Sequence, residues 1–202
     1  MSAADEARIG KAIQSAEKKT SGEIVAVVAS DSDSYLWAPI LAAALLALAV
    51  EAPLIIFTWI TIQWIYVIQI LTFAILALLL SRPPLRYWLV PSSVKRERAH
   101  RRAVEQFLAQ NLHTTSGRTG VLIFVSVAER YAEILADSGI HKKVAPEDWQ
   151  QIVSQLTAAI SDGHTGDGFV EAINRCGTLL AKHFPPGSHD PNGLPDHLIV
   201  LG

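Results

Sequence analysis

The chain has 202 residues, and its 17 Lys and Arg residues nearly balance its 19 Asp and Glu residues, for a formal net charge of −2. This balance argues against a surface built for nucleic acid, which would carry a strong positive charge. Half of the residues are apolar and 18% are charged, below the roughly 25% typical of soluble domains, so a disordered chain is also excluded. A single cysteine, Cys176, rules out an internal disulfide and a CxxC metal or redox motif.

The N-terminal segment predicts one helix and one strand. Ser2 and Asp5 have the spacing of a helix start, and Ile9 and Ile13 follow at helical intervals. Residues 24–29 then form a short apolar run between polar residues, which predicts a buried strand. So short a segment cannot bury a core alone, and we therefore expect it to fold together with a later part of the chain.

A long apolar stretch follows this strand. Between Ser34 and Ser81 the only acidic or basic residue is Glu51. As a single helix, this stretch would be about 67 Å long, roughly twice the hydrocarbon thickness of a bilayer. The sequence therefore predicts two membrane-spanning helices, at about residues 36–57 and 62–80. The alternative, a buried hairpin of a soluble protein, would need more chain to cover it than the sequence provides.

Glu51 is the one charged residue in the predicted spans. It lies about 21 Å along the first helix from Trp37, so its carboxylate could reach the lipid headgroups. The alternative is an intramembrane proton or ion site, which would need a polar partner. The nearby candidates are Thr58, Thr61 and Gln63.

Basic residues gather after the second span, whereas the turn between the spans has no Lys or Arg. The basic residues are Arg82, Arg86, Lys95, Arg96, Arg98, Arg101 and Arg102. Since the basic side of a membrane protein faces the cytoplasm, and two spans return the chain to the same side, we expect both termini to be cytoplasmic. The sequence thus predicts an inner-membrane protein with two spans.

The same basic residues have three interpretations. We favour contact with anionic lipid headgroups, to which each Lys or Arg near the surface contributes about 1 kcal/mol. Nucleic-acid binding would call for interleaved aromatic residues and a basic domain, whereas the isoelectric point is about 6.4. The third interpretation is a solvated helix face that serves only as a topology signal.

The second half of the chain predicts a helix and a hairpin of strands. Residues 94–112 have helical apolar spacing. Residues 121–127 are almost continuously apolar and β-branched, as expected of a central strand covered on both faces. A short connection then leads to residues 131–136, which we predict to form an antiparallel neighbour.

Two further helices complete the predicted elements. Pro146, followed by Glu147 and Asp148, has the pattern of a helix start, and helical spacing continues to about residue 160. The stretch 161–168 is predicted to end this helix, and the last helix is expected over residues 169–183. The remaining tail is turn-forming until residues 198–201.

This order of elements predicts an α/β fold, a small sheet with helices on both faces that is interrupted by a two-helix transmembrane hairpin. We expect residues 1–34 and 82–202 to form one folded body and residues 35–81 to form the hairpin. Both parts of the body must lie in one compartment, which independently requires an even number of spans.

Four acidic residues follow predicted strands: Asp31, Asp33, Glu129 and Asp137. A hard cation such as Ca²⁺ or Mg²⁺ needs several oxygen ligands that converge from separate loops. These four would form such a site if all of them met at one edge of the sheet. The alternative is that they are solvated turn residues, and Asp31 and Asp33 also suit a chain that enters a membrane interface.

Sequence motifs of catalysis are absent. The sequence contains no P-loop spacing, no HExxH and no GxSxG. Cys176 lies on the apolar face of a predicted helix, which favours a buried side chain over a nucleophile. We therefore assign no catalytic residue and no cofactor.

Four segments together resemble the TPM domain family. They are TGVLIFVSVAERYAEILADSGI at 119–140, PEDW at 146–149, the DGF-x3-I-x3-G stretch at 167–177, and SGEIVAVVASDSDSY at 21–35. The chain looks like the membrane-embedded bacterial subgroup, in which a hairpin splits the domain. The resemblance implies an α/β domain, divalent cation binding in some relatives, acid phosphatase activity proposed for some plant relatives, and accessory roles in membrane complexes.

These observations lead to two hypotheses of function. The first is a membrane-tethered binding or scaffolding module for another membrane protein, with Ca²⁺ or Mg²⁺ as a candidate ligand. The second is a metal-dependent hydrolase of phosphate esters. Turnover of a phosphate ester that depends on a cation would favour the second.

Overall fold

The computed structural model describes residues 2–115, 117–186 and 197–201, and the chain divides into two compact units. The α/β unit comprises Met1–Ser32 and Arg96–Gly202, and the hairpin unit comprises Asp33–Lys95. The α/β unit is thus assembled from two segments that are far apart in the sequence.

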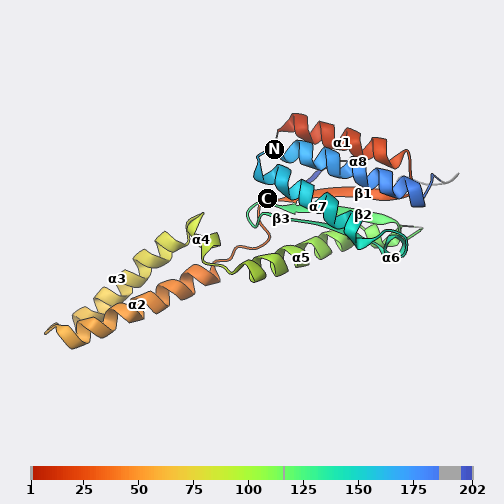
Figure 1. The fold of residues 1–202 in the computed structure, drawn as a ribbon. Coiled ribbons are helices and arrows are strands. Elements are labelled where there is room, and N and C mark those ends of the chain that lie inside the picture. Colours follow the sequence, from red (N-terminus) through yellow and green to blue (C-terminus); the bar gives the residue numbers. More distant parts are fainter. Residues whose placement is uncertain (1, 116, 187–196, 202) are drawn as a thin grey trace. The chain divides into compact units, whose positions relative to one another are not determined.

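Within the described residues, the α/β unit contains a four-stranded sheet in the order β3-β2-β1-β4 (Figure 1). Strand β1 (Glu23–Ala29) pairs in parallel with β2 (Gly120–Ser126) on one side and with β4 (Ile199–Leu201) on the other. Strand β3 (Tyr131–Ala136) pairs antiparallel with β2. Every residue of β1 and β2 is buried, which explains why both are continuously apolar.

Helices cover both faces of the sheet, so the predicted α/β fold is confirmed (Figure 1). Helices α1 (Ala3–Glu17), α7 (Pro146–Ser161) and α8 (Thr165–His183) form the larger core with one face. Helix α5 (Ser92–Ala109) and the 3₁₀ turn Leu112–Thr114 pack on the other face. Side chains that alternate along β1 and β2 therefore enter two separate cores.

Local sequence explains where the helices begin. The Ser2 Oγ accepts a hydrogen bond of 3.2 Å from the Asp5 N–H, and the Asp5 carboxylate accepts one of 3.1 Å from the Ser2 N–H. This reciprocal arrangement satisfies two donors that the first turn of α1 leaves without partners. Pro146 is the first residue of α7, with Glu147 and Asp148 in its first turn, as predicted.

The structure differs from the predicted elements at several places in the C-terminal part. The tail forms β4, which the sequence analysis did not assign as a strand. Helix α8 begins at Thr165 rather than near residue 169, so Asp167 and Gly168 lie in its first turn. Glycines disfavour helices, but here close helix packing outweighs their propensity.

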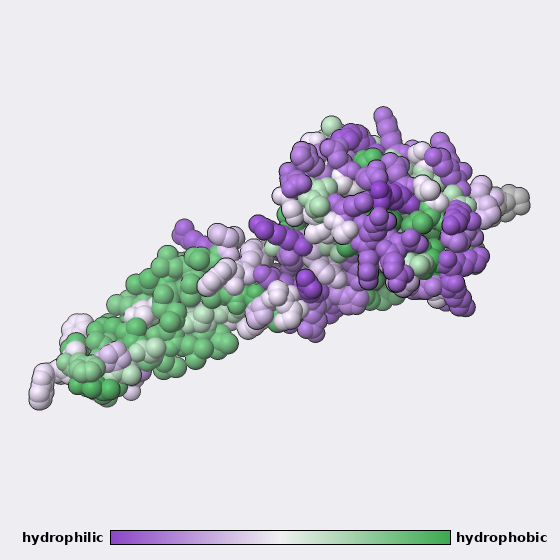
Figure 2. Space-filling model, viewed as in Figure 1, coloured by the Kyte–Doolittle hydropathy of each residue, from purple (hydrophilic) through white to green (hydrophobic). Residues whose placement is uncertain are grey.

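The hairpin unit is built on two long helices, α2 (Trp37–Phe57) and α3 (Ile62–Leu80), which pack against each other and match the predicted spans. Most of their apolar side chains are exposed, and Figure 2 shows this unit as a hydrophobic surface. By length and composition, both helices could cross a membrane.

The hairpin unit extends beyond the predicted residues 35–81, because the segment after α3 packs back on the segment before α2. Tyr35, Ala38 and Val90 are buried together, and the rings of Tyr35 and Tyr87 meet edge to face at 5.9 Å. A short helix, α4 (Leu85–Trp88), lies in this segment and was not predicted. The unit therefore has a small core of its own.

Candidate functional site

The carboxyl ends of the parallel strands meet at one edge of the sheet, which is where ligands commonly bind in α/β folds. The chain leaves the α/β unit at this edge, at Ser32, just beyond β1. It re-enters at Arg96, which interacts electrostatically with Tyr131 at the start of β3. The register pairs Tyr131 with Ser126, the last residue of β2. Exit and re-entry therefore lie at the same edge.

Glu129 joins the segment that follows β1 to the end of β2 at this edge. Its Oε1 accepts a hydrogen bond of 2.9 Å from the Ser32 N–H, and its Oε2 accepts a short one from the Ser126 hydroxyl. The Ser32 hydroxyl donates to the Ser126 oxygen at 2.9 Å, which completes the chain of contacts. Ser126 is fully buried. This cluster thus fixes the exit of β1 to the turn that follows β2.

The structure does not bring the four predicted cation ligands together. Asp31 and Glu129 lie at the carboxyl edge described above, and Asp33 belongs to the hairpin unit. Asp137 lies at the opposite edge, where its N–H donates to the carbonyl of Gly120, the first residue of β2. The cause is the antiparallel direction of β3, which carries the chain back across the sheet.

No group of three or more His, Cys, Asp or Glu side chains among the described residues is arranged to hold a metal ion. Asp137 instead caps the short helix α6 (Ser138–His141), because its carboxylate accepts a 2.6 Å hydrogen bond from the Ser138 N–H. It also lies 3.8 Å from the Arg118 guanidinium. Its position is therefore explained by the local fold.

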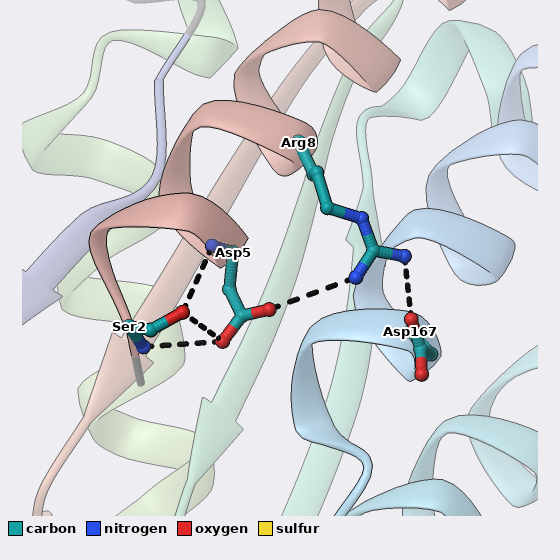
Figure 3. A network of polar contacts seen from close by, with 4 residues as sticks. All are labelled: Ser2, Asp5, Arg8 and Asp167. Atoms are coloured by element: carbon teal, nitrogen blue, oxygen red, sulfur yellow. Dashed lines mark hydrogen bonds and ion pairs between the residues drawn. The ribbon is translucent and has the colours of Figure 1, made fainter.

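The glycine and acidic residues of the 167–177 stretch serve helix packing. Arg8 on α1 forms a 2.5 Å ion pair with Asp167 on α8 and lies 3.7 Å from Asp5 (Figure 3). A Cβ added at Gly168 would lie 2.8 Å from the Ala159 side chain on α7, and one added at Gly177 would lie 2.6 Å from the Ala16 side chain on α1. The stretch therefore holds α8 between its two neighbours.

Two groups of the network in Figure 3 have shifted pKa values. Hydrogen bonds from Ser2 lower the pKa of the Asp5 carboxyl, and the hydrogen bond to Asp167 raises the pKa of the Arg8 guanidinium. Because the carboxyl pKa is lowered on folding, its contribution to stability is present above the ordinary value of 3.8 and is lost as the pH falls through the lowered pKa.

A cleft of about 540 Å³ lies between α5, the start of β3 and α7. His100 on α5 lines it, and its Nδ1 lies 3.0 Å from both carboxylate oxygens of Glu133 on β3. The Tyr131 hydroxyl donates to the same carboxylate at 3.0 Å. Burial and the neighbouring Glu133 raise the pKa of Tyr131 well above its usual value, so this hydroxyl stays protonated.

A second concave region runs between α7 and α8. Two cavities of about 330 and 240 Å³ share Ile152, Glu171 and Arg175 as lining residues. Ile152 and Leu156 are buried beneath the groove, and Glu171 and Arg175 form a 2.8 Å ion pair beside it. We call this region the α7–α8 groove.

In the hairpin unit, Glu51 has a partner that the sequence analysis missed. The Gln69 side-chain amide donates to the Glu51 carboxylate at 3.1 Å. The predicted candidates Thr58, Thr61 and Gln63 do not take this position, and the Thr58 hydroxyl donates instead to the Leu54 carbonyl at 2.5 Å. An antiparallel pairing of the two predicted spans would have placed Gln69 across from Glu51.

The basic residues after α3 divide between the two units. Arg86 lies 4.7 Å from the centre of the Tyr87 ring, and the Lys95 ammonium donates to the Tyr87 carbonyl at 3.1 Å. On α5, Arg101 and Arg102 both pair with Glu105. In the sequence these residues form one stretch, and its pattern gave no signal for His100 and Arg130, which line the cleft from different elements.

A family model described as TPM domain matches residues 85–179, which include β2, β3 and the cleft. The chain is similar to a solved structure, the NMR structure of the BA42 protein from the psychrophilic bacterium Bizionia argentinensis. The TM-score is 0.61 at 22% sequence identity, over 99% of this chain and 94% of that chain, a likeness of fold alone. A comparison with curated proteins gives no match.

Proposed function

Since the chain carries a TPM domain, we propose that it is a two-span protein of the bacterial inner membrane whose α/β unit acts in the cytoplasm as a binding module. Its partner in this proposal is another membrane protein, which the module scaffolds or assists. The observation that carries the proposal is the exposed apolar surface of α2 and α3.

Helices α2 and α3 have the dimensions of membrane spans. With 21 and 19 residues, each is about 30 Å long, the thickness of the hydrocarbon core. Within their most apolar stretches, only 11% and 6% of the residues are buried. A core helix of a soluble protein would instead be mostly covered, so a lipid environment accounts best for these side chains.

The fold supports a location of the whole α/β unit on one side of the membrane. Both of its segments contribute strands to one sheet, so they must share a compartment. The basic residues that follow α3 favour the cytoplasm as that compartment. An even number of spans is consistent with both requirements.

The α7–α8 groove supports a binding role. Its apolar floor and charged edges are the features of a surface that accepts a segment of another protein. A tether in the same membrane would raise the local concentration of the module near a membrane-bound partner. A weak contact at the groove would then be sufficient.

Thiol labelling in spheroplasts tests the membrane topology. The native Cys176 should stay unlabelled by a membrane-impermeant maleimide at neutral pH, because it is fully buried and burial raises the pKa of its thiol to about 12. Trp59→Cys, at a fully exposed position in the turn between the spans, should be labelled in intact spheroplasts. Ser154→Cys, exposed on α7, should be labelled only after lysis.

The parent chain with Cys176 alone is the control for both variants. Labelling of Ser154→Cys in intact spheroplasts would place the α/β unit outside the cytoplasm. Labelling of both variants only after lysis would contradict the two spans.

Site-specific photo-crosslinking tests the binding role. A photoreactive residue at Gln151 or Asn174, which line the α7–α8 groove, should give an adduct of the same defined mass in membranes. The same residue at Glu105, on the other side of the sheet, should give none. The variant Glu171→Lys should weaken the groove adduct, because it removes an ion pair and reverses a charge at the groove.

The absence of any groove-specific adduct, with the parent chain folded in the membrane, would contradict the binding proposal. Cation-dependent hydrolysis of a phosphate ester by the purified chain would favour the hydrolase hypothesis in its place. That assay uses the full chain with Ca²⁺ or Mg²⁺.

A further inference from the structure

The cleft between α5, β3 and α7 carries two guanidinium groups from different elements. Arg96 comes from the first turns of α5, and Arg130 comes from the turn between β2 and β3. Arg130 has a backbone φ of 51°, a left-handed conformation that non-glycine residues rarely adopt. Among the described residues that line the cleft, these two guanidinium groups outnumber the one carboxylate, Glu97, while Glu133 contacts the lining residues His100 and Tyr131.

The two arginines of the cleft differ from other arginines of the α/β unit. Among the described residues, neither Arg96 nor Arg130 has a carboxylate within ion-pair distance. A carboxylate partner is present for Arg8, Arg101, Arg102, Arg118 and Arg175. The hydrogen-bond donors of the cleft arginines are therefore available to an anion from outside the chain.

His100 adds a third polar group to the same cleft. Its Nδ1–H donates to the Glu133 carboxylate, so Nε2 donates to an anion when both ring nitrogens carry a proton. The Tyr131 hydroxyl also donates a hydrogen bond to Glu133, so this carboxylate has two partners within the chain. The Thr157 side chain lines the cleft from α7.

We propose that this cleft binds a phosphate group, with Arg96 and Arg130 as its principal ligands and the doubly protonated form of His100 as an additional one. Guanidinium groups match the oxygen geometry of phosphate, and a charge-assisted hydrogen bond is about twice as strong as a neutral one. The phosphate belongs either to an anionic lipid headgroup or to a soluble phosphate ester, and the recognition chemistry is the same for both.

A fluorescence titration of the full chain in phosphatidylcholine nanodiscs tests this proposal. An environment-sensitive fluorophore on Ser154→Cys reports from α7, one residue from Val153 in the cleft wall, while the native thiol is buried. Inorganic phosphate should give a saturable change. The double variant Arg96→Gln/Arg130→Gln should weaken the apparent affinity about tenfold or more, since several charge-assisted hydrogen bonds are lost.

The matched control is Arg101→Gln/Arg102→Gln, which removes the same charge from α5 outside the cleft and should leave the affinity within about twofold of the parent. Equal loss in both double variants would reduce the effect to general electrostatics and overturn the site. A parent chain without a saturable response would overturn it as well. All of the substituted side chains are at least partly exposed, and circular dichroism verifies that each variant is folded.

A second arm distinguishes the two sources of phosphate. In discs that contain phosphatidylglycerol, weaker apparent binding of inorganic phosphate would identify the headgroup as the occupant. Unchanged binding would identify a soluble phosphate ester. Both outcomes retain the phosphate site, and neither depends on the topology that the thiol labelling tests.

Discussion

Residues 61–202 produced without residues 1–60 should fail to fold, and production of both fragments together should restore the α/β unit. Strand β1 is an inner strand of the sheet and holds both β2 and β4. The first fragment also supplies six fully or nearly buried Ile and Val side chains on α1 and β1. At about 1.5 to 3 kcal/mol for each, their loss is comparable to the entire stability of a typical domain.

Hydrogen exchange of the β2 amides in the membrane-reconstituted fragments measures this outcome. Protection should be absent in the 61–202 fragment and should return when the 1–60 fragment is produced with it. As a control, Val27→Asp in the first fragment should prevent the rescue, because it places an unpaired carboxylate at a fully buried position of β1. A protected β2 in the second fragment alone would show that the sheet does not need β1.

The variant Gly177→Val should destabilise the α/β unit by about 2 to 3 kcal/mol. At this position α8 contacts α1 so closely that a Cβ would lie 2.6 Å from the Ala16 Cβ and 3.2 Å from its Cα. The helices would have to separate, and this kind of overpacking lowers the stability of a core. The measurement is the free energy of opening from hydrogen exchange of β2 in the full chain.

Two further variants make this result specific to the helix contact. Thr178→Val changes the exposed neighbouring residue of α8 and should alter the free energy of opening by less than about 0.5 kcal/mol. Adding Ala16→Gly to Gly177→Val should recover part of the loss, because it removes the atom nearest to the new side chain. If the double variant recovers no stability, the loss in Gly177→Val would come from the helix propensity of valine rather than from packing.

Elements whose signal is local in the sequence were predicted well. The apolar composition of α2 and α3 and the reciprocal cap of Ser2 and Asp5 depend on neighbouring residues alone. Strand β4 was missed because it has three residues and gains its structure from pairing with β1, which is distant in the sequence. Likewise, α8 includes Gly166 and Gly168 because packing against α1 and α7 favours small residues there.

The position of the predicted cation ligands depended on strand direction, and the predicted direction of β3 was not applied to Asp137. The sequence predicted an antiparallel pair of strands after residue 120, and such a pair places Asp137 at the edge of the sheet opposite Glu129. The cleft residues were harder to group. Arg96 and His100 share a helix, but Arg130 reaches them only through the turn after β2. Such a convergence of separate elements is a property of the fold.

The insertion of the hairpin between β1 and β2 sets an order of events during synthesis. The ribosome makes α1 and β1 first, then the two apolar helices, and only afterwards the strand that β1 requires as a neighbour. In the topology proposed above, the N-terminal segment stays in the cytoplasm without its sheet while the hairpin enters the bilayer. Membrane insertion would then precede folding of the α/β unit, and a chaperone that binds nascent chains would encounter β1 as an unpaired apolar segment.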